Sequence, residues 1–513
     1  MVMKNLFLIQ IVSLLLFVAT IPVFSQGYEI SVSLKTPSDT VLLGYYFAKS
    51  TYVSDTAILK NGKGVFRGDK KLEKGVYFLV SKKRIFFDHL IIGDQQKFSV
   101  VSDTVDFINQ TKFTASPDNE VFFDYARHNI NRGKQQQQLI EQYRNAASDA
   151  EKTEISAKLS SLTKESLAYV DQLIENNRHL YVSKIINSQI PMTVRVPEAP
   201  KDADGNAADP NFQYRWYRAH FFDNLNIFDP DMIRTSAYED KLFEYISILP
   251  YHTDTICTEI DKIMTKAKAN DVIFRNLLST LYNHYVKLAQ DIIVDNRGIA
   301  PENVWLHLVE KWYIPYATWS TEENTENLKK EVANRKPNLI GKHTPPIEML
   351  TILPTDHFKA AALDTAIKFD LHAGRMVEDF RKDNALKSKF TVLLFWDMTC
   401  GHCKQAIQDL YNVWEEHKNN GLQVVTVQIY LTDRSDKGKW IDFVNEKNLF
   451  GTGWVNAWSP YSHTYRDLYN TAVVPVMYLL DENFDIILRG NLKGTIGAET
   501  IKEFCDNQFK NRK

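Results

Sequence analysis

The stretch FWDMTCGHCKQ, residues 395–405, decides the fold of the C-terminal part of this chain. It holds two cysteines, Cys400 and Cys403, with two residues between them. The apolar run FTVLLFW comes before the motif and predicts a strand, and apolar residues three and four apart come after it and predict a helix. A C-x-x-C at the junction of strand and helix indicates a redox centre, half of a metal site or a structural disulfide.

The position of the two cysteines favours redox chemistry. Cys400 would lie at the helix N-terminus, where free backbone N–H groups and the helix dipole stabilise a thiolate, which is the form that attacks a disulfide. Cys403, one turn further in, is suited to resolving the mixed disulfide. His402 adds a donor or a positive charge, so the Gly401-His402 spacer is expected to tune the reduction potential. A zinc site needs four ligands, and no second C-x-x-C occurs in the sequence, so no metal is predicted.

The sequence around the motif predicts an α/β region. A boundary is expected near residue 336, because Pro337, Gly341 and Pro345-Pro346 interrupt the preceding pattern. Further strands are expected at 422–431 and in a hairpin at 476–490, and a last helix from about Ala498 to Phe509. Strand, helix, strand, hairpin and helix in this order indicate an α/β fold.

These motifs carry a resemblance to a known family. Phe395-Trp396, Cys400 to Lys404 and VVPVMYLLD resemble the thioredoxin fold, and specifically the TlpA/ResA-like extracytoplasmic thiol–disulfide oxidoreductases. In that family a cis-proline lies beside the dithiol, and Pro475 after Val474 matches its place. The resemblance implies a cis Val474-Pro475 bond and a substrate surface formed by Val474, Pro475 and Trp396.

The chain departs from the family in its acids. A buried acid six residues before the first cysteine is replaced by Leu394, and a glutamate three residues after the second cysteine is replaced by Ala406. The tryptophan usual before the first cysteine is Thr399. The base that deprotonates Cys403 therefore stays open, with Asp397 and Lys404 as nearby candidates.

The chain ahead of this region divides into two parts. Period-two alternation from Tyr28 to Lys35 and later strand-like runs predict an antiparallel β-sandwich domain at 26–115. Apolar residues three and four apart predict an all-α domain at 116–335, followed by the thioredoxin-like domain at 336–513. Both front parts resemble domains found before thioredoxin modules in exported Bacteroidetes proteins.

The first residues predict export. One lysine, an apolar run, Pro22 and Ser25 form the pattern of a signal peptide at 1–25, although an uncleaved membrane anchor is the alternative. No cysteine precedes Cys257, so a lipoprotein anchor is excluded. Together with the resemblance, this predicts the periplasm of a Gram-negative bacterium.

Composition excludes other classes. The 513 residues are 44% hydrophobic and 24% charged with a net charge of −2, so no nucleic-acid surface is expected. Cys257 and Cys505 are isolated and predicted to be buried. The loop Asp202 to Asp209 has its glycine too early for a calcium loop and is predicted to be a polar surface connection.

Our leading hypothesis is an exported thiol–disulfide oxidoreductase without any cofactor beyond its own redox-active Cys400–Cys403 disulfide. Its expected partners are cysteine-containing envelope proteins and a membrane thiol–disulfide electron donor or acceptor, whereas its oligomeric state is left open. The direction of electron flow is also open, because it depends on a few tens of millivolts. The alternative is an envelope binding or scaffold protein whose dithiol is vestigial or structural. A peroxidase is disfavoured, because Cys400 occupies the place of the threonine expected before a peroxidatic Cys403.

Overall fold

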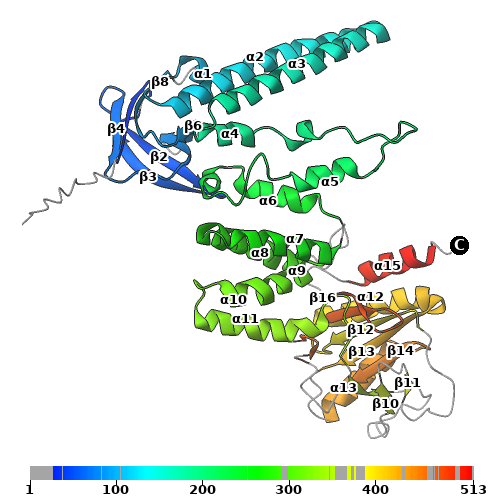
Figure 1. Cartoon of the computed structure of the whole chain (residues 1–513). Helices are drawn as coiled ribbons and strands as arrows, with labels where there is room; N and C mark the ends of the chain where they lie inside the picture. Colours follow the sequence, from blue (N-terminus) through cyan, green and yellow to red (C-terminus); the bar gives the residue numbers. More distant parts are fainter. Residues whose placement is uncertain are drawn as a thin grey trace, which may run out of the picture. The chain divides into compact units, whose positions relative to one another are not determined.

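The structure is a computed structural model in two compact units, one ending at Leu242 and one beginning at Phe243 (Figure 1). It describes residues 27–36, 38–81, 84–103, 106–250, 252–291, 299–345, 347–352, 367–370, 375–376, 388–429, 434–458, 466, 468–471, 473–491 and 497–510. The predicted signal peptide at 1–25 lies outside these residues. The boundary falls inside helix α6 (Tyr238–Ser247), so the predicted helical region 116–335 is divided between the units.

Unit 1 opens with two four-stranded sheets, ordered β4-β1-β7-β8 and β3-β2-β5-β6. The strands are β1 (Tyr28–Leu34), β2 (Thr40–Phe47), β3 (Ser50–Ile58), β4 (Lys63–Gly68), β5 (Gly75–Ser81), β6 (Arg84–Ile92), β7 (Lys97–Ser102) and β8 (Lys112–Thr114). Buried residues alternate with half-buried ones along β1, which confirms the period-two prediction. The ring centroids of Phe87 on β6 and Phe113 on β8 are 6.4 Å apart, so the two sheets meet.

The prediction of a wholly antiparallel sandwich is wrong at one pair. Strands β1 and β7 pair in parallel, with Ile30 opposite Phe98 and Val32 opposite Val100. The chain leaves the first sheet after β4, forms β5 and β6 in the second sheet, and returns with β7 running in the direction of β1. Local alternation defines strands but does not define their direction, which depends on this long connection.

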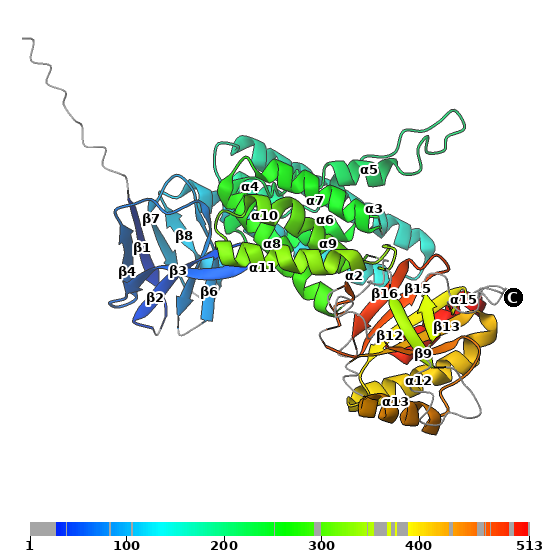
Figure 2. The same cartoon turned by 90° about the horizontal axis from the view of Figure 1, so that it is seen from below.

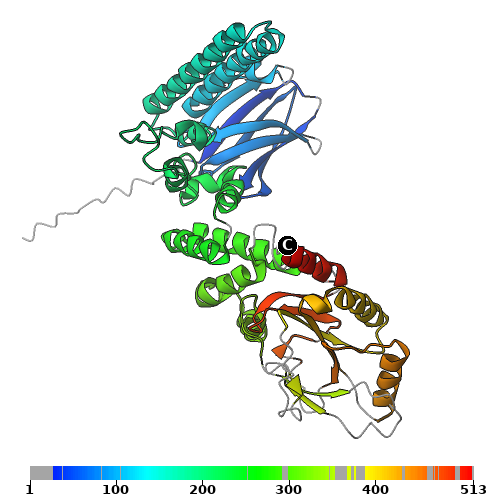
Figure 3. The ribbon, with the colours of Figure 1, turned by 90° about the vertical axis from the view of Figure 1, so that its right-hand side faces the viewer.

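The helices of unit 1 are fixed to the sheets by the start of α2. They are α1 (Phe107–Gln110), α2 (Pro117–Asn145), α3 (Asp149–Asn176), α4 (Val182–Ser188), η1 (Met192–Arg195), α5 (Phe212–Ala219) and η2 (Pro230–Arg234). The side chain of Asn119 accepts from the Ile91 backbone N–H and donates to the Ile91 carbonyl, both at 2.8 Å. Asp118 accepts from the backbone N–H of Val182 at 2.8 Å. Buried polar contacts therefore join the sheets and helices of unit 1. Figure 3 shows the helices beside the strands.

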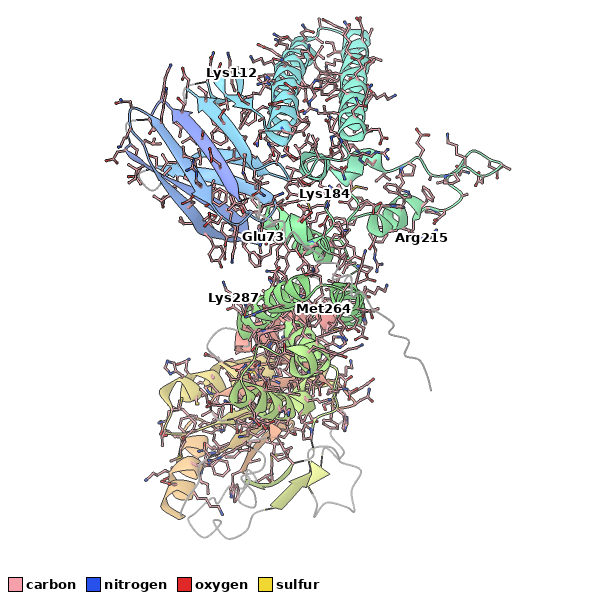
Figure 4. All side chains as sticks on the ribbon, turned by 60° about the vertical axis from the view of Figure 1, so that its left-hand side comes forward. Glu73, Lys112, Lys184, Arg215, Met264 and Lys287 are labelled. Atoms are coloured by element: carbon pink, nitrogen blue, oxygen red, sulfur yellow. The ribbon has the colours of Figure 1, made fainter. Side chains whose placement is uncertain are left out.

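Two polar features complete unit 1. Lys184 of α4, labelled in Figure 4, pairs with Asp229 at 2.7 Å and Asp231 at 3.2 Å and so holds α4 to η2. In the loop Asp202 to Asp209, the Asp202 carboxylate accepts from the backbone N–H groups of Asp204 and Asn206, at 3.0 and 2.9 Å. The loop is exposed, and this carboxylate closes the turn.

Unit 2 begins with a helical layer. Its members are α7 (Thr253–Ala267), α8 (Asp271–Asp291), α9 (Pro301–Leu308), the π-helical turn η3 (Val309–Tyr313), α10 (Ile314–Tyr316), α11 (Glu322–Arg335) and η4 (Lys336–Asn338). Trp305 and Trp312 are buried, as their helical spacing predicts, whereas Tyr316 is exposed. None of the helices within the described residues is long and apolar enough to cross a membrane.

Asp261 of α7 organises this layer. Its carboxylate accepts from His307 Nε2 at 2.8 Å and from Lys311 Nζ and Trp312 Nε1, both at 2.7 Å. Burial by itself would raise the pKa of Asp261, but the hydrogen bonds from Lys311, Trp312 and His307 outweigh it and lower the pKa below its usual value. Folding therefore favours the charged form of this group.

We expect the Asp261→Asn variant to lower the free energy of unfolding of unit 2 at neutral pH by about 2 kcal/mol. Because the folded-state pKa of Asp261 is lowered, its contribution is present above the unfolded value and lost as the pH falls through the folded value. The difference between wild type and variant should shrink between about pH 5 and pH 3. Urea unfolding at several pH values measures it; a pH-independent difference would contradict the assignment. Asp254→Asn, at an exposed carboxylate of the same helix, is the control.

The rest of unit 2 is an α/β structure with helices beside one sheet (Figure 2). Within the described residues the strand order is β11-β10-β9-β14-β13-β12-β15-β16. The strands are β9 (Glu348–Ile352), β10 (Ile367–Asp370), β11 (Arg375–Met376), β12 (Phe390–Trp396), β13 (Leu422–Gln428), β14 (Trp454–Trp458), β15 (Val476–Leu480) and β16 (Ile486–Asn491). The helices are α12 (Gly401–His417), α13 (Arg434–Glu446) and α15 (Ala498–Lys510), with η7 (Lys418–Asn420) after α12.

Strand β12 lies at the centre of this arrangement. It pairs in parallel with β13 and antiparallel with β15, and β15 forms the predicted hairpin with β16. Its side chains divide between two apolar clusters, with Leu394 and Trp396 on the face covered by α12, and Leu393 and Phe395 on the other. A strand buried on both faces reads as a continuous apolar run, which is why FTVLLFW has no alternation.

Candidate active site

Cys400 is the N-cap residue of α12. Its backbone is extended (φ −85°, ψ 117°), and its sulfur accepts a hydrogen bond from the backbone N–H of Cys403 at 3.4 Å. The apolar face of α12, with Ile407 and Leu410, is buried against the sheet, so this end of the helix has a fixed place. The Cys400 sulfur therefore lies at the N-terminus of α12, beside the free backbone N–H groups of its first turn.

A tight turn connects β12 to Cys400. The Asp397 carbonyl accepts from the Cys400 backbone N–H at 3.0 Å, and the Asp397 carboxylate accepts from the Thr399 backbone N–H at 2.9 Å. The Met398 backbone N–H donates to the side chain of Gln428 on β13 at 3.0 Å. Sequence reasoning missed Gln428, although a glutamine in the apolar run LQVVTVQIYL was a visible signal. Hydrogen bonds to Asp397 and to Gln428 therefore hold the turn that carries Cys400.

Cys403 differs from Cys400 in exposure. Cys400 is half-buried, whereas Cys403 is fully buried. Burial is the largest cause that raises the pKa of Cys403 to about 12, and the hydrogen bond and charge of Cys400 and the charge of Asp397 add to it. The backbone N–H of Asp397 acts in the opposite direction. An accessible sulfur stands beside a protected one, which is the division of roles that dithiol exchange requires.

Val474 and Pro475 lie at the end of the sheet from which the chain leads to the dithiol. Their peptide bond is cis, which confirms that expectation. Pro475 comes directly before β15, whose first residue Val476 pairs with Phe395 near the end of β12. Val474 and Cys400 both pack against the apolar cluster that contains Cys403, and Val473 is 58% exposed. The predicted proline and the two cysteines therefore meet at one end of the sheet.

The other predicted site residues are placed differently. Trp396 is fully buried and its ring lies 5.6 Å from that of Phe443, a placement that argues against the predicted substrate contact and assigns it to the core. The end of β12 is covered on both faces, so no side chain of that strand reaches the surface there. Gly401 and His402 are exposed in the first turn of α12, and the tuning role of His402 stays a prediction.

At the two positions where the resembled family carries an acid, this chain has buried apolar residues. Leu394 is fully buried, and Ala406 is buried as well. Of the two candidate bases, Lys404 is exposed with its ammonium 5.7 Å from the Phe443 ring centroid, and Asp397 belongs to the turn before Cys400. Of the two remaining cysteines, Cys505 is buried as predicted, whereas the prediction is wrong for Cys257, which is half-buried; burial raises the pKa of both thiols to about 12.

The front part of the chain matches two family models, and both are described as domains of unknown function. One (DUF4369) matches residues 28–122, and the other (DUF5106) matches residues 147–332. The second match extends across the boundary at Leu242. A comparison with the curated proteins found no match.

Solved structures similar to this chain are thioredoxin-like thiol–disulfide proteins, and the likeness covers part of the chain. A thioredoxin-like protein from Bacteroides caccae is 16% identical, with a TM-score of 0.38, over 60% of this chain and 96% of that chain. A domain of a possible thiol-disulfide isomerase from Cytophaga hutchinsonii is 27% identical, with a TM-score of 0.24, over 34% and 96%. The thioredoxin domain of a thiol-disulfide oxidoreductase from Bacteroides vulgatus is 16% identical, with a TM-score of 0.24, over 33% and 96%.

Proposed function

We propose that this protein is a thiol–disulfide oxidoreductase of the TlpA/ResA-like type, exported to the periplasm, which exchanges disulfides through Cys400 and Cys403. One observation carries the proposal: the half-buried Cys400 sulfur caps α12 and accepts the backbone N–H of Cys403, while Cys403 is fully buried. A capped, accessible sulfur can attack as a thiolate, and a protected one beside it can complete the exchange.

The exchange needs no other redox group. The Cys400 thiolate attacks one sulfur of a substrate disulfide, the second substrate sulfur leaves with the electron pair, and a mixed disulfide forms. Cys403 then attacks Cys400 and releases the substrate in reduced form. Cysteine-containing envelope proteins are the proposed substrates, and a membrane thiol–disulfide donor or acceptor is the proposed source or sink of electrons. The backbone of Val474 and Pro475 is proposed to pair with the substrate segment as an added strand.

The reduction potential of the Cys400–Cys403 couple tests the proposal. The mature protein is equilibrated in glutathione buffers and the two thiols are counted after acid quenching and alkylation. We expect a reversible two-electron couple. A value of about −180 mV or higher would assign it to an oxidase or isomerase, and one of about −270 mV or lower to a reductant. The absence of any reversible couple would exclude the oxidoreductase.

A second candidate function, a binding or scaffold protein, is supported by an open groove in unit 1. It measures about 710 Å³, and aromatic Trp216 and the ion pair of Arg195 with Asp171 are among its lining groups. This volume is in the range of ligand sites. If a strain that carries the Cys400→Ser, Cys403→Ser double variant grows like one that carries the wild-type protein, while deletion of the whole protein impairs growth, this candidate would be favoured.

A further inference from the structure

Because Cys403 is buried, the proposed exchange needs a group that accepts the proton of its thiol. Once Cys400 is tied to a substrate, Cys403 must lose its proton before its sulfur can attack. Burial, the neighbouring Cys400 and the charge of Asp397 all hold the pKa of Cys403 high, at about 12. Formation of the mixed disulfide removes the Cys400 thiolate and with it one of these causes, but burial persists. The inference that follows rests on the proposed exchange through Cys400 and Cys403.

Few described groups around Cys403 can accept a proton. The titratable groups that act on its thiol are Cys400 and Asp397. On α12 itself, His402 is exposed and Lys404 extends toward Phe443. Strand β13 contributes Gln428, which is uncharged, and Val473 to Pro475 contribute no titratable group. The apolar cluster that encloses the Cys403 side chain is made of aliphatic, aromatic and sulfur-containing residues.

The turn before the helix holds Asp397 next to the dithiol motif. The Asp397 carbonyl accepts from the Cys400 backbone N–H at 3.0 Å, and the charge of Asp397 acts on the Cys403 thiol. Its carboxylate uses one oxygen for the Thr399 backbone N–H, at 2.9 Å, and this leaves its other oxygen available. The residue is half-buried, so its charge is screened by solvent less than a surface charge would be.

We propose that the Asp397 carboxylate accepts the proton of Cys403 when Cys403 attacks the mixed disulfide at Cys400. The Cys403 S–H bond breaks and its proton moves to Asp397, while the sulfur electron pair forms the bond to Cys400 Sγ. The bond between Cys400 and the substrate sulfur breaks, and the substrate leaves as a thiolate with that electron pair. The two protein sulfurs are thereby oxidised, the substrate is reduced, and Asp397 passes the proton to the released thiolate or to solvent.

Electrostatics favours sharing of one proton by this pair. Two negative charges close together in a partly buried place repel, so ionisation of Cys403 makes protonation of Asp397 more favourable. The same coupling works in reverse when the disulfide is reduced again, and Asp397 can then return the proton to Cys403. The positions of Leu394 and Ala406 hold no acid. Under this proposal Asp397, which lies between β12 and α12, supplies the missing carboxylate.

The Asp397→Asn variant tests the proposal, because asparagine keeps an acceptor for the Thr399 N–H and loses the proton-accepting charge. Reduced protein is mixed with excess dithiobis(nitrobenzoate) in a stopped-flow instrument. The first release of coloured thiolate reports attack by Cys400, and the second reports attack by Cys403 on the mixed disulfide. We expect the second step to slow by about 10²-fold in Asp397→Asn, while the first changes little. Its rate should also rise about tenfold per pH unit, because hydroxide becomes the base.

Three variants make the outcome decisive. Asp397→Glu should recover much of the second step, since it restores a carboxylate. Asp409→Asn, at an exposed carboxylate of α12 that accepts from Gln405 at 2.9 Å, should leave both steps unchanged. A normal second step with the wild-type pH profile in Asp397→Asn would overturn the proposal, and so would a defect seen in Asp397→Ala but not in Asp397→Asn, which would identify a role in the turn alone. If wild type shows no second release, the proposed exchange itself fails.

Discussion

The Cys400→Ser variant is expected to lose thiol–disulfide exchange almost completely, by about 10³-fold or more relative to wild type. Serine has nearly the same size and retains a cap acceptor at the start of α12, but its hydroxyl is not ionised at neutral pH and does not attack disulfides. Reduction of a protein disulfide by the full chain in the presence of a thiol donor measures the loss.

The partner cysteine and a distant cysteine supply the controls. The Cys403→Ser variant should accumulate a mixed disulfide between Cys400 and the substrate, visible as a covalent adduct on a non-reducing gel. Cys257→Ser changes a half-buried thiol on α7 and should keep wild-type activity. Exchange at the wild-type rate by Cys400→Ser would rule out the proposed nucleophile.

The Glu302→Ala variant is expected to lower the free energy of unfolding of unit 2 by about 3 kcal/mol. Glu302, in the first turn of α9, pairs with Arg335 of α11 at 3.1 Å and with Arg489 of β16 at 3.3 Å. Arg489 and Glu302 are only 13% and 14% exposed. Removal of the carboxylate leaves the largely buried Arg489 guanidinium with the Asn338 carbonyl as its one acceptor among the described residues, and an uncompensated buried charge is costly.

Tryptophan fluorescence during urea unfolding of the full chain is a selective measurement of this effect. Of the nine tryptophans, Trp216 is the one before Phe243, so the signal comes mainly from unit 2. Glu310→Ala is the matched control, because Glu310 pairs with Lys336 at 2.7 Å where both side chains are much more exposed. It should cost less than about 1 kcal/mol. Equal costs for the two variants would contradict the role of burial.

The helical layer of unit 2 and its α/β sheet are therefore one structure. Glu302, Arg335 and Arg489 come from a helix, a second helix and a strand, and Asn303 of α9 donates to the Ile340 carbonyl at 3.0 Å. Composition changes near Lys336 and predicts a boundary there, but the ion pair of Glu302 with Arg489 crosses this point with only 14% and 13% of the two side chains exposed. A change in composition marks a change of secondary structure, and it does not by itself mark a break in packing.

The sequence by itself determined the features that depend on neighbouring residues. The alternation in β1, the apolar run of β12, the amphipathic pattern of α12 and the placement of Cys400 at a helix start are all local patterns. Each follows from side-chain spacing along one element, which sequence periodicity reports directly. The position of Pro475 before a strand was also predicted, because the surrounding residues resemble a family motif.

Only the tertiary structure decided the features that depend on residues far apart in the chain. The parallel pairing of β1 with β7, the burial of Trp396, the hydrogen bond from Met398 to Gln428 and the ion pairs of Glu302 all join separate elements. Asp397 is an instructive case, since its sequence position was visible but its effect on the Cys403 thiol depends on the turn that joins it to Cys400. Periodicity identifies which face of an element is apolar, whereas its partner is selected by packing of the whole unit.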